Sequence, residues 1–550
     1  MLEVDTFETN ERRYRSWSRL TGRGPEASQK WDVIVIGGGI TGAGILREAA
    51  RRGLKAALIE QQDFAWGTSS RSSKMVHGGL RYLLGAHLKL TRDSVRERER
   101  LLRESPGLID PLGFLFSNYK GKRPGRFSMN VLLITYDLFA RRWNHRYYPA
   151  HEYTFLVPWI RLSGLKGGSR YGDAVTDDSR LVLRVIQEAQ RDGALALNYV
   201  KAENLITKNG RVCGVHVRDV LSGETAEIPS RTVVNATGAW ADRLRRQVAG
   251  GEDIRPLRGS HLVFPYWRIP IAQAVGLMHP IDGRPVFFMP WEGATIVGST
   301  DLDHDKDLDF EARITRQEVD YLMEIVDYQF PSLEIKKGDI LSTFSGIRPV
   351  ISGGAVDPSK EKRDHSIWVE KGLISVSGGK LTTFRLIALD VLRHVARFIP
   401  ELVVKDVGEP VFRMTSSHER ATAHLDCSLR RRLAGHYGEE AGEVVKCAKQ
   451  GELERVPGTD TLWVELRWAL GREAVVHLDD LLLRRTRLGM LLPEGGVSVL
   501  DYVKNLCREV LGWKDERWHG EDSAYRSLWR KCYSVPGTEE IQLRTGSIPT

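Results

Sequence analysis

The sequence predicts an α/β protein with three parts, and three observations lead to this prediction. A buried strand, closely spaced glycines and a helical pattern follow one another over residues 31–60. Short β-like segments alternate with turns at about 255–348, and charged, leucine-rich helical patterns occupy 398–550. A chain of 550 residues is also too long for one core. We expect a Rossmann-like domain over 31–397, an antiparallel cap inserted mainly at about 255–348, a helical domain over 398–550 and a polar, mobile extension over 1–30.

The glycine-rich turn after the first strand predicts a dinucleotide site. Gly37, Gly39 and Gly42 follow the apolar run Val33–Ile36 with the G-x-G-x-x-G spacing. The first glycine permits a tight turn, the second lets backbone approach a pyrophosphate, and the third lets the helix pack on the strand. A second predicted strand ends in Glu60, 18 residues after the third glycine, where a carboxylate would meet a ribose hydroxyl. An ordinary glycine-rich turn is the alternative, but it would not need all these parts in order.

The segment from Thr68 to Tyr82 is dense in small hydroxyl residues, glycines and cations. Its hydroxyl groups could bind phosphate or ribitol oxygens, and Gly78 and Gly79 would let the backbone pass close to a flat group. A solvated serine-rich loop is the alternative, although linkers seldom hold cations and an aromatic residue among glycines.

Periodicity and turn residues predict further elements. Asp177 or Asp178 is expected to cap an amphipathic helix that continues to Arg191. Other helices are expected at Leu88–Leu102, Val131–Ala140 and Glu318–Tyr328, and strands at Val212–Val217, Arg231–Asn235 and Leu373–Val376. The apolar helix at 131–140 precedes the basic, aromatic run R-R-W-N-H-R-Y-Y, which fits either a membrane interface or a basic turn after a buried helix.

Composition and charge argue against several classes of protein. The 80 Lys and Arg against 71 Asp and Glu give a net charge of +9, which is too diffuse to indicate nucleic-acid binding. The sequence contains no run of about 18 apolar residues, so no transmembrane helix is expected. The charged N-terminus lacks the apolar core of a secretory signal. The five cysteines form no C-x-x-C pair, so we expect no metal or iron–sulfur site and a reducing, cytoplasmic location.

Seven motifs occur in a fixed order: G-G-G-I-T-G, T-S-S-R-S-S-K-M-V-H-G-G-L-R-Y, V-N-A-T-G-A-W, R-G-S-H, P-W-x6-G-S-T-D, S-G-I-R-P and G-G-K-L-T-T-F-R. Together they closely resemble the FAD-dependent, aerobic (respiratory) glycerol-3-phosphate dehydrogenase family, over about residues 32–397. The resemblance implies FAD as cofactor, glycerol 3-phosphate as substrate and quinone as electron acceptor. It also implies a peripheral protein on the inner face of the cytoplasmic membrane, with a homodimer as one option and no nucleic-acid partner.

This reaction needs a grip on the phosphate, a base for the C2 hydroxyl and a cation near the flavin. Candidates for the phosphate are Arg81, Arg348 and Arg363, because a guanidinium matches two phosphate oxygens, and Tyr82 is a further candidate for a substrate contact. His261 is the preferred base because an imidazole is neutral near pH 7, so Arg348 is assigned to a substrate oxygen. Lys380 is placed at the flavin N1–C2 edge, and the catalytic set is His261, Arg348 and Lys380. The sequence leaves the identity of the base open.

The motifs also supply the expected cofactor-binding residues. These are Gly37, Gly39, Gly42, Glu60, Thr68, Ser69, Ser70, Ser73, Lys74, Gly78, Gly79, Gly238, Gly379, Lys380, Leu381 and Thr382. Thr41, Trp66-Gly67 and His365 depart from the family pattern, but none of these departures removes a charged group. We therefore expect them to affect fine geometry more than the type of reaction.

Other functions fit parts of the sequence. A glycerol-3-phosphate oxidase of the same fold would use oxygen, but such oxidases carry a long insertion between the G-x-R-P and G-G-K motifs, and here Arg348 and Lys380 are only 32 positions apart. A flavoprotein that binds and modifies RNA would rest on the basic excess alone. A nicotinamide-dependent reductase is disfavoured because no second G-x-G-x-x-G follows a strand.

Overall fold

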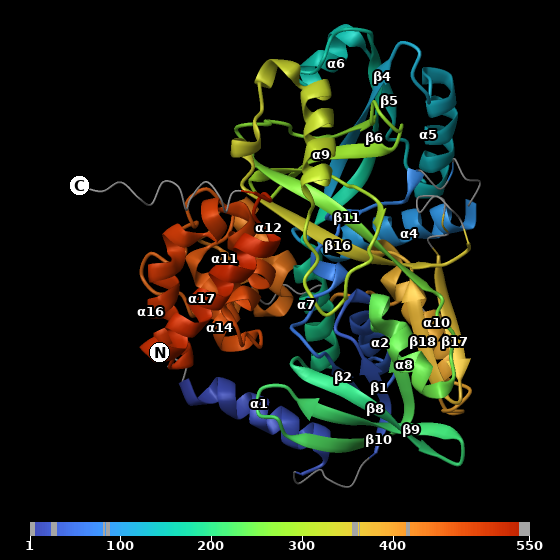
Figure 1. Ribbon diagram of the computed structural model, residues 1–550, viewed down its shortest axis with the longest axis vertical. Coiled ribbons are helices and arrows are strands. Elements are labelled where there is room, and N and C mark those ends of the chain that lie inside the picture. Colours follow the sequence, from blue (N-terminus) through green and yellow to red (C-terminus); the bar gives the residue numbers. More distant parts are fainter. Residues whose placement is uncertain are drawn as a thin grey trace.

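The computed structural model describes residues 6–23, 30–80, 83, 88–354, 361, 364–406, 408–413 and 419–537 of the 550-residue chain. Figure 1 shows the nucleotide-binding sheet in the lower part of the molecule, the cap above it and the C-terminal helices to one side. The predicted α/β fold, with its antiparallel cap and C-terminal helical domain, is confirmed.

The nucleotide-binding sheet has the strand order β17-β18-β10-β1-β2-β7. Its strands are β1 (Trp31–Ile36), β2 (Ala56–Ile59), β7 (Leu195–Leu197), β10 (Thr225–Asn235), β17 (His365–Glu370) and β18 (Leu373–Gly378). All neighbouring pairs from β18 to β7 are parallel, so the carboxyl ends of these strands meet at one edge, where such sheets bind ligands. The predicted strands at 231–235 and 373–376 lie within β10 and β18.

Apolar layers cover both faces of this sheet. Helices α2 (Ile40–Ala50), α7 (Asp178–Arg191) and α10 (Phe384–Val395) pack on one face. The hairpin of β8 (Val200–Lys208) and β9 (Arg211–Asp219) extends β10 and packs on the other face. Asp177 caps α7 as predicted, because its side chain accepts hydrogen bonds from the backbone N–H groups of Ser179 and Arg180.

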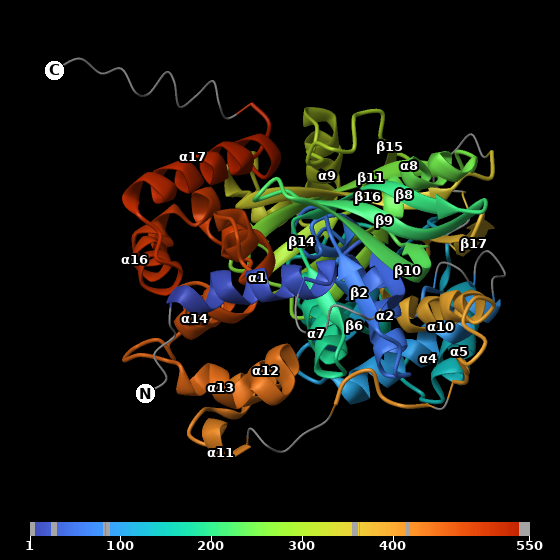
Figure 2. The ribbon, with the colours of Figure 1, turned by 90° about the horizontal axis from the view of Figure 1, so that it is seen from below.

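The N-terminal stretch is not wholly the mobile extension that the sequence predicts. Helix α1 (Thr6–Thr21) buries Trp17 and Leu20, which are 4% and 2% exposed. The indole Nε1 of Trp17 donates to Glu224 at 2.8 Å. Figure 2 shows α1 running from the sheet toward α14 (Trp463–Arg472) and α16 (Leu500–Leu511), which it contacts. The prediction failed because a few apolar residues scattered among many charges give only a weak helical signal.

The cap is a second sheet with the order β15-β11-β14-β13-β12-β4-β6-β3, in which β16 also pairs with β11 and β5 with β6. Its strands are β3 (Met75–Val76), β4 (Ile109–Tyr119), β5 (Arg146–Pro149), β6 (Leu165–Thr176), β11 (Ile254–Pro265), β12 (Ala274–Met278), β13 (Pro285–Trp291), β14 (Ala294–Gly298), β15 (Leu302–Asp303) and β16 (Ser342–Ile351). All described pairs are antiparallel except β12 with β4.

The cap is therefore larger than the sequence indicates, because residues 109–176 contribute β4, β5 and β6. The glycine-rich strand β6 (L-K-G-G-S-R-Y-G-D-A-V-T) has no clean alternation of apolar and polar residues, so its pattern did not predict a strand. The cap helices are α4 (Leu88–Glu104), α5 (Arg126–Ala140), α6 (Ala150–Leu156) and α9 (Arg316–Gln329).

The C-terminal domain packs against the cap and the nucleotide-binding domain. Its helices are α11 (Glu419–Thr422), α12 (Cys427–Tyr437), α13 (Ala441–Lys446), α14, α15 (Leu488–Leu491), α16 and α17 (Asp515–Cys532), with a π-helical turn at Asp480–Arg485. Trp291 and Phe344 of the cap share one apolar core with Leu481 of this domain. Buried Asp63 of the nucleotide-binding domain pairs with Arg484 and Arg485. Among the described helices, none combines the length and apolar character that a membrane span requires.

Candidate active site

The turn between β1 and α2 can exist only with glycine at key positions. Gly37 has φ +115°, and a Cβ atom there would lie 2.6 Å from the carbonyl oxygen of Ala236. A Cβ atom on Gly42 would lie 1.9 Å from the carbonyl oxygen of Gly37. Gly42 therefore provides the close approach of helix and strand, while Gly37 and Gly39 line a cavity.

Glu60 anchors the same turn from the end of β2. Its carboxylate accepts hydrogen bonds from the backbone N–H of Gly38 at 2.7 Å and of Gln62 at 2.9 Å. Burial raises the pKa of Glu60 above its usual value, although these backbone donors oppose the rise. The residue thus shapes the glycine loop and also lines the cavity where a ribose is expected.

Two adjoining cavities lie at the carboxyl edge of the sheet, with volumes of about 360 and 870 Å³. They share the lining residues Thr68, Ser72, Pro349, Gly379, Lys380 and Leu381. Of the expected cofactor residues, the smaller cavity also has Gly37, Gly39, Glu60, Ser69 and Gly238 on its wall. The larger one also has Ser73, Gly79 and Thr382. The structure therefore joins a glycine-lined crevice to a roomier chamber.

His261 projects from β11 into the larger cavity. Its Nε2 lies 2.8 Å from Oγ of Ser73, its side chain is 2% exposed, and Nδ1 has no hydrogen-bond partner among the described residues. Burial, followed by the charges of Arg348 and Lys74, lowers the pKa of His261 well below its usual value. The imidazole is therefore neutral near pH 7.

Arg348 on β16 lines the same cavity as His261, because β16 and β11 are antiparallel neighbours. Its guanidinium donates to Asp301 Oδ1 at 2.8 Å and to Ser299 Oγ at 2.6 Å. The side chain remains 24% exposed and lines the chamber. This arrangement fixes a cation where an oxygen-rich ligand can meet it.

The G-G-K-L-T-T segment forms the wall between the two cavities. Nζ of Lys380 lies 3.2 Å from Oγ of Ser94 on α4. The hydroxyl of Thr382 accepts from the N–H of His77 at 3.1 Å and donates to its carbonyl at 3.2 Å. This double hydrogen bond joins the segment to the hydroxyl-rich loop at 68–80.

Several expected site residues lie elsewhere. Ser70, Lys74 and Gly78 line neither of these cavities. Nζ of Lys74 is instead buried and donates to Asp178, while the N–H of Gly78 donates to Tyr136 at 2.8 Å. Arg81, Tyr82 and Arg363 lie outside the described residues, so their roles stay predictions.

Two further arginines line the larger cavity, and the sequence did not single them out. Arg71 is ion-paired with Glu311, and Arg284 donates to Asp282 at 2.9 Å and to the carbonyl of Asp301. Arg71 lies inside the hydroxyl-rich motif, which was a usable signal. Arg284 lies in an ordinary D-G-R-P turn, and only the pairing of β13 with its neighbours brings it to the site.

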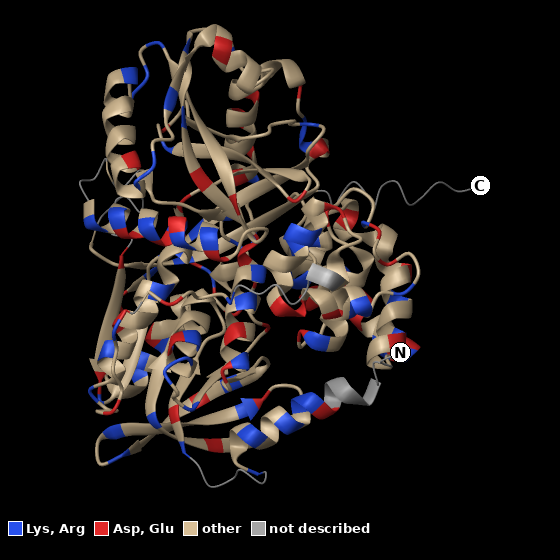
Figure 3. Cartoon of the chain, turned by 180° about the vertical axis from the view of Figure 1, so that it is seen from behind, with Lys and Arg blue, Asp and Glu red and all other residues tan. Residues whose placement is uncertain are grey.

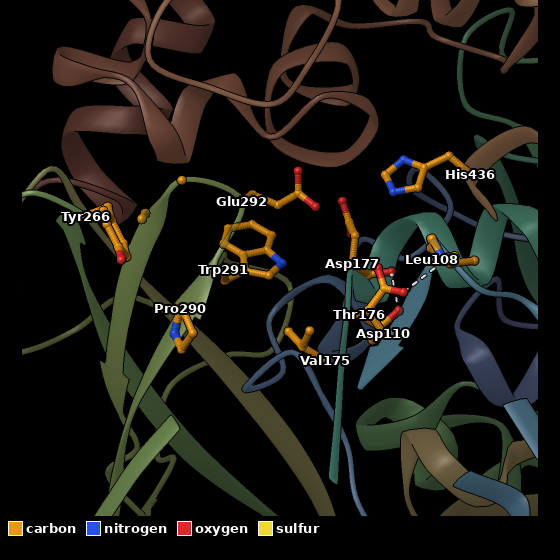
Figure 4. A pocket seen from close by; sticks show the side chains of 13 residues that line it. Leu108, Asp110, Val175, Thr176, Asp177, Tyr266, Pro290, Trp291, Glu292 and His436 are labelled. Atoms are coloured by element: carbon orange, nitrogen blue, oxygen red, sulfur yellow. Dashed lines mark hydrogen bonds between the residues drawn. The ribbon is translucent and has the colours of Figure 1, made fainter. Parts of the chain in front are cut away.

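A third cavity of about 390 Å³ lies at the junction of the cap with the C-terminal domain (Figure 4). Asp177, Trp291, Glu292 and His436 surround it. Burial raises the pKa of Glu292 to about 7, and burial followed by the charge of Arg432 lowers the pKa of His436 well below its usual value. This junction therefore contains ionisable groups that are poorly solvated.

The backbone and the wall of the paired cavities suit FAD. The smaller cavity offers glycine backbone and hydroxyl groups for a diphosphate and ribose, and its wall continues to the chamber that holds His261 and Arg348. This fold and site define a flavin-dependent oxidoreductase. Accordingly, residues 32–388 match the FAD dependent oxidoreductase family, and residues 407–518 match the C-terminal domain of alpha-glycerophosphate oxidase.

Relatives that match this chain over most of their length identify the family within this class. The chain is 35% identical to the aerobic glycerol-3-phosphate dehydrogenase of Staphylococcus haemolyticus over 485 residues, which are 84% of this chain and 87% of that protein. The same enzyme of Staphylococcus epidermidis is 35% identical over 509 residues, 88% and 90% of the two chains. The chain belongs to the FAD-dependent aerobic glycerol-3-phosphate dehydrogenase family, and its cofactor is FAD.

One solved structure agrees with this assignment, and a more distant one shares the fold. The glycerol-3-phosphate dehydrogenase from Bacillus halodurans, complexed with FAD, has a TM-score of 0.75 at 28% identity and covers 96% of this chain and 98% of its own. The L-alpha-glycerophosphate oxidase from Mycoplasma pneumoniae, with a TM-score of 0.54 at 19% identity over 70% of this chain and 98% of its own, shares the fold.

Proposed function

We propose that this chain oxidises sn-glycerol 3-phosphate at C2 to dihydroxyacetone phosphate and passes the electrons to a quinone. The supporting observation is that His261 and Arg348 face one chamber beside Gly379 and Lys380. FAD, when bound, supplies a hydride acceptor at the flavin N5. The substrate is taken from the names of the relatives, which are glycerol-3-phosphate dehydrogenases.

We assign the role of general base to His261. Its ring is neutral near pH 7, so one nitrogen carries a lone pair that can accept the proton of the C2 hydroxyl. The hydrogen bond with Ser73 fixes the ring in the chamber. Arg348, which is held by Asp301 and Ser299, would bind a substrate oxygen and orient C2.

Cations around the chamber support an anionic substrate. Lys380 and Arg284 line it together with Arg348. Arg81, Tyr82 and Arg363 remain our candidates for further contacts with the substrate. Lys380 is also proposed to stabilise negative charge on the reduced flavin, because its segment forms the wall between the two cavities.

A membrane quinone as acceptor is supported by the surface of α5. Phe127, Val131 and Leu138 are 84%, 49% and 65% exposed, and their spacing places them on one stripe of the helix. The flanking segments carry exposed cations at Lys120, Lys122, Arg123, Arg126, Arg141, Arg142 and Arg146. An apolar stripe with flanking cations suits the surface of an anionic bilayer. We propose that this surface rests on the inner face of the cytoplasmic membrane.

Charge over the rest of the molecule gives no support to an RNA-modifying enzyme. In the view of Figure 3, basic and acidic residues are interspersed over all three parts of the chain. The oxidase alternative differs from the proposal only in the acceptor, so it is decided by the same experiment.

Anaerobic mixing of the yellow holoenzyme with sn-glycerol 3-phosphate tests the proposal. We expect bleaching of the flavin absorbance, then rapid recovery with a soluble quinone analogue and slow recovery with oxygen. No bleaching would refute the substrate. Rapid recovery with oxygen and peroxide release would instead identify an oxidase.

A further inference from the structure

A buried ionic network joins the hydroxyl-rich loop of the active site to the C-terminal domain. Nζ of Lys74 is completely buried and donates to the carbonyl of Ser70 at 2.6 Å and to Asp178 at 2.8 and 3.0 Å. Arg487 enters from the C-terminal domain and donates to the same carbonyl of Ser70 at 3.2 Å. It also binds Asp177 at 2.8 Å and pairs with Asp178.

This network holds the part of the loop that faces the catalytic chamber. Asp178 accepts hydrogen bonds from the N–H of Ser72 at 2.9 Å and from its hydroxyl at 2.7 Å. The next residue, Ser73, is the hydrogen-bond partner of His261. The loop then passes through Lys74 with φ +58°, a left-handed conformation that persists in a residue with a side chain only where surrounding contacts hold it.

The charges of the network balance only when Arg487 is present. Asp177 and Asp178 are both buried, and in the part of the chain that the structure describes Lys74 and Arg487 are the two cations that form ion pairs with them. Without Arg487, two buried carboxylates would share one ammonium group, and Asp177 would lose its charged partner. The carbonyl oxygen of Ser70 in the loop backbone would also lose one of its two hydrogen-bond donors. The position of Ser73 therefore depends on a side chain that the C-terminal domain contributes.

We propose that Arg487 is a positioning residue for the oxidation: by binding Asp177, Asp178 and the carbonyl of Ser70, it fixes the Ser70–Lys74 loop so that Ser73 aligns His261. The proposal rests on the proposed function for its kinetic consequence. It assigns the docked C-terminal domain a role in arranging the active site. It also gives Lys74 a structural task in place of the expected contact with the cofactor.

A second buried ion pair between the same two parts of the chain serves as a matched control. Arg180 on α7 pairs with Glu473 of the C-terminal domain, and both side chains are 1% exposed. Neither residue lines a described cavity or contacts the Ser70–Lys74 loop. The backbone N–H of Arg180 donates to Asp177 at 3.2 Å, but Glu473→Gln changes neither this bond nor any hydrogen bond of Arg487, so it weakens domain docking while the proposed positioning contacts stay in place.

The test compares holoenzyme of the wild type, Arg487→Met, Arg487→Lys and Glu473→Gln. We expect Arg487→Met to slow flavin reduction by glycerol 3-phosphate ~10- to 100-fold, with little change in the substrate concentration for half-saturation, because a misaligned base affects the chemical step. Arg487→Lys should recover part of the reduction rate. If Arg487→Met yields no holoenzyme, a reduction rate in Arg487→Lys below that of the wild type supports the proposal, and a wild-type rate overturns it. Glu473→Gln should lower the melting temperature and leave the reduction rate within about twofold of the wild type.

Hydrogen exchange provides a readout that does not depend on activity. Amides of the 70–76 segment should exchange faster in both Arg487 variants and at the wild-type rate in Glu473→Gln. Unchanged exchange and reduction in the Arg487 variants would overturn the proposal, as would an equal loss of rate in Glu473→Gln. If glycerol 3-phosphate does not bleach the flavin of the wild-type enzyme, the proposed function is refuted instead. Hydrogen exchange in the Arg487 variants would still decide whether Arg487 positions the loop.

Discussion

Phe344 stacks on His261, with ring centroids 4.5 Å apart and ring planes inclined by 9°. Phe344 comes from β16 and His261 from β11, where the two residues are paired in register. The stack covers one face of the imidazole while Ser73 holds its edge, so the ring has one orientation and little contact with water. A base prepared in this way needs no rearrangement when substrate arrives.

Replacing His261 tests its role as base. His261→Asn should slow flavin reduction ~10²- to 10⁴-fold, the usual contribution of a general base, and should change substrate binding much less. Stopped-flow absorbance under anaerobic conditions measures both quantities. Phe344→Leu keeps the imidazole and should cost far less. Equal reduction rates in His261→Asn and the wild type would remove His261 from the mechanism.

Arg348 is expected to act through its charge and its planar shape. Arg348→Met should lower kcat/KM ~10- to 150-fold, because a hydrogen bond to a charged group contributes about 1.5–3 kcal/mol. Arg348→Lys keeps the charge but loses the two-pronged geometry, so its loss should be intermediate. The exposed Arg508, which pairs with Asp515 far from the chamber, supplies Arg508→Met as the control. A wild-type kcat/KM in Arg348→Met would contradict the assignment.

The close approach of Gly42 to Gly37 predicts that a side chain at position 42 would reduce binding of the cofactor. Gly42→Ala should lower the free energy of unfolding by ~1–3 kcal/mol, because its Cβ atom would collide with the carbonyl of Gly37 and push α2 from β1. The purified variant should also contain less FAD per chain, measured by absorbance after denaturation. Gly520→Ala in α17 has open space around the new atom and should stabilise the helix by ~0.5–1 kcal/mol. Full FAD content in Gly42→Ala would show that the turn tolerates a displaced helix.

Glu292 predicts a pH dependence of stability. Burial raises its pKa to about 7 in the folded protein, against an ordinary value of 4.5, so between these pH values the folded state binds more protons than the unfolded state. The contribution of Glu292 to stability therefore falls as pH rises from about 4.5 to 7. Glu292→Gln should gain melting temperature relative to the wild type as pH rises from 5 to 8. Parallel curves of melting temperature against pH for Glu292→Gln and the wild type would refute the prediction.

The exposed stripe on α5 predicts binding to anionic vesicles. Phe127→Ser combined with Leu138→Ser should reduce co-flotation with vesicles that contain anionic phospholipid, because it removes apolar area from the proposed contact. Flavin reduction in solution should stay unchanged, since neither residue lines the chamber. Purely zwitterionic vesicles should bind the wild type less well. Undiminished flotation of the double variant would place the membrane contact elsewhere.

Local sequence patterns predicted the parts of the site that depend on residues adjacent in the sequence. The glycine turn, the acid at the end of β2 and the cap of α7 each follow from a few consecutive residues, and the structure contains all three. The contact between Arg487 and Asp177 could not be predicted in this way, because their positions differ by 310 residues. Lys74 illustrates the same limit: its motif suggested a ligand contact, whereas its surroundings enclose it with Asp178.

The parallel pairing of β12 with β4 has a consequence for biosynthesis. Ala274 pairs with Phe114, so a ribosome must add more than 150 residues after β4 before this second neighbour of β4 exists. The nucleotide-binding sheet is completed later in the chain, since β18 at Leu373–Gly378 completes the pairing of β10. Nascent chains therefore carry unpaired strand edges through most of translation, and we expect their yield to depend on chaperones that shield such edges.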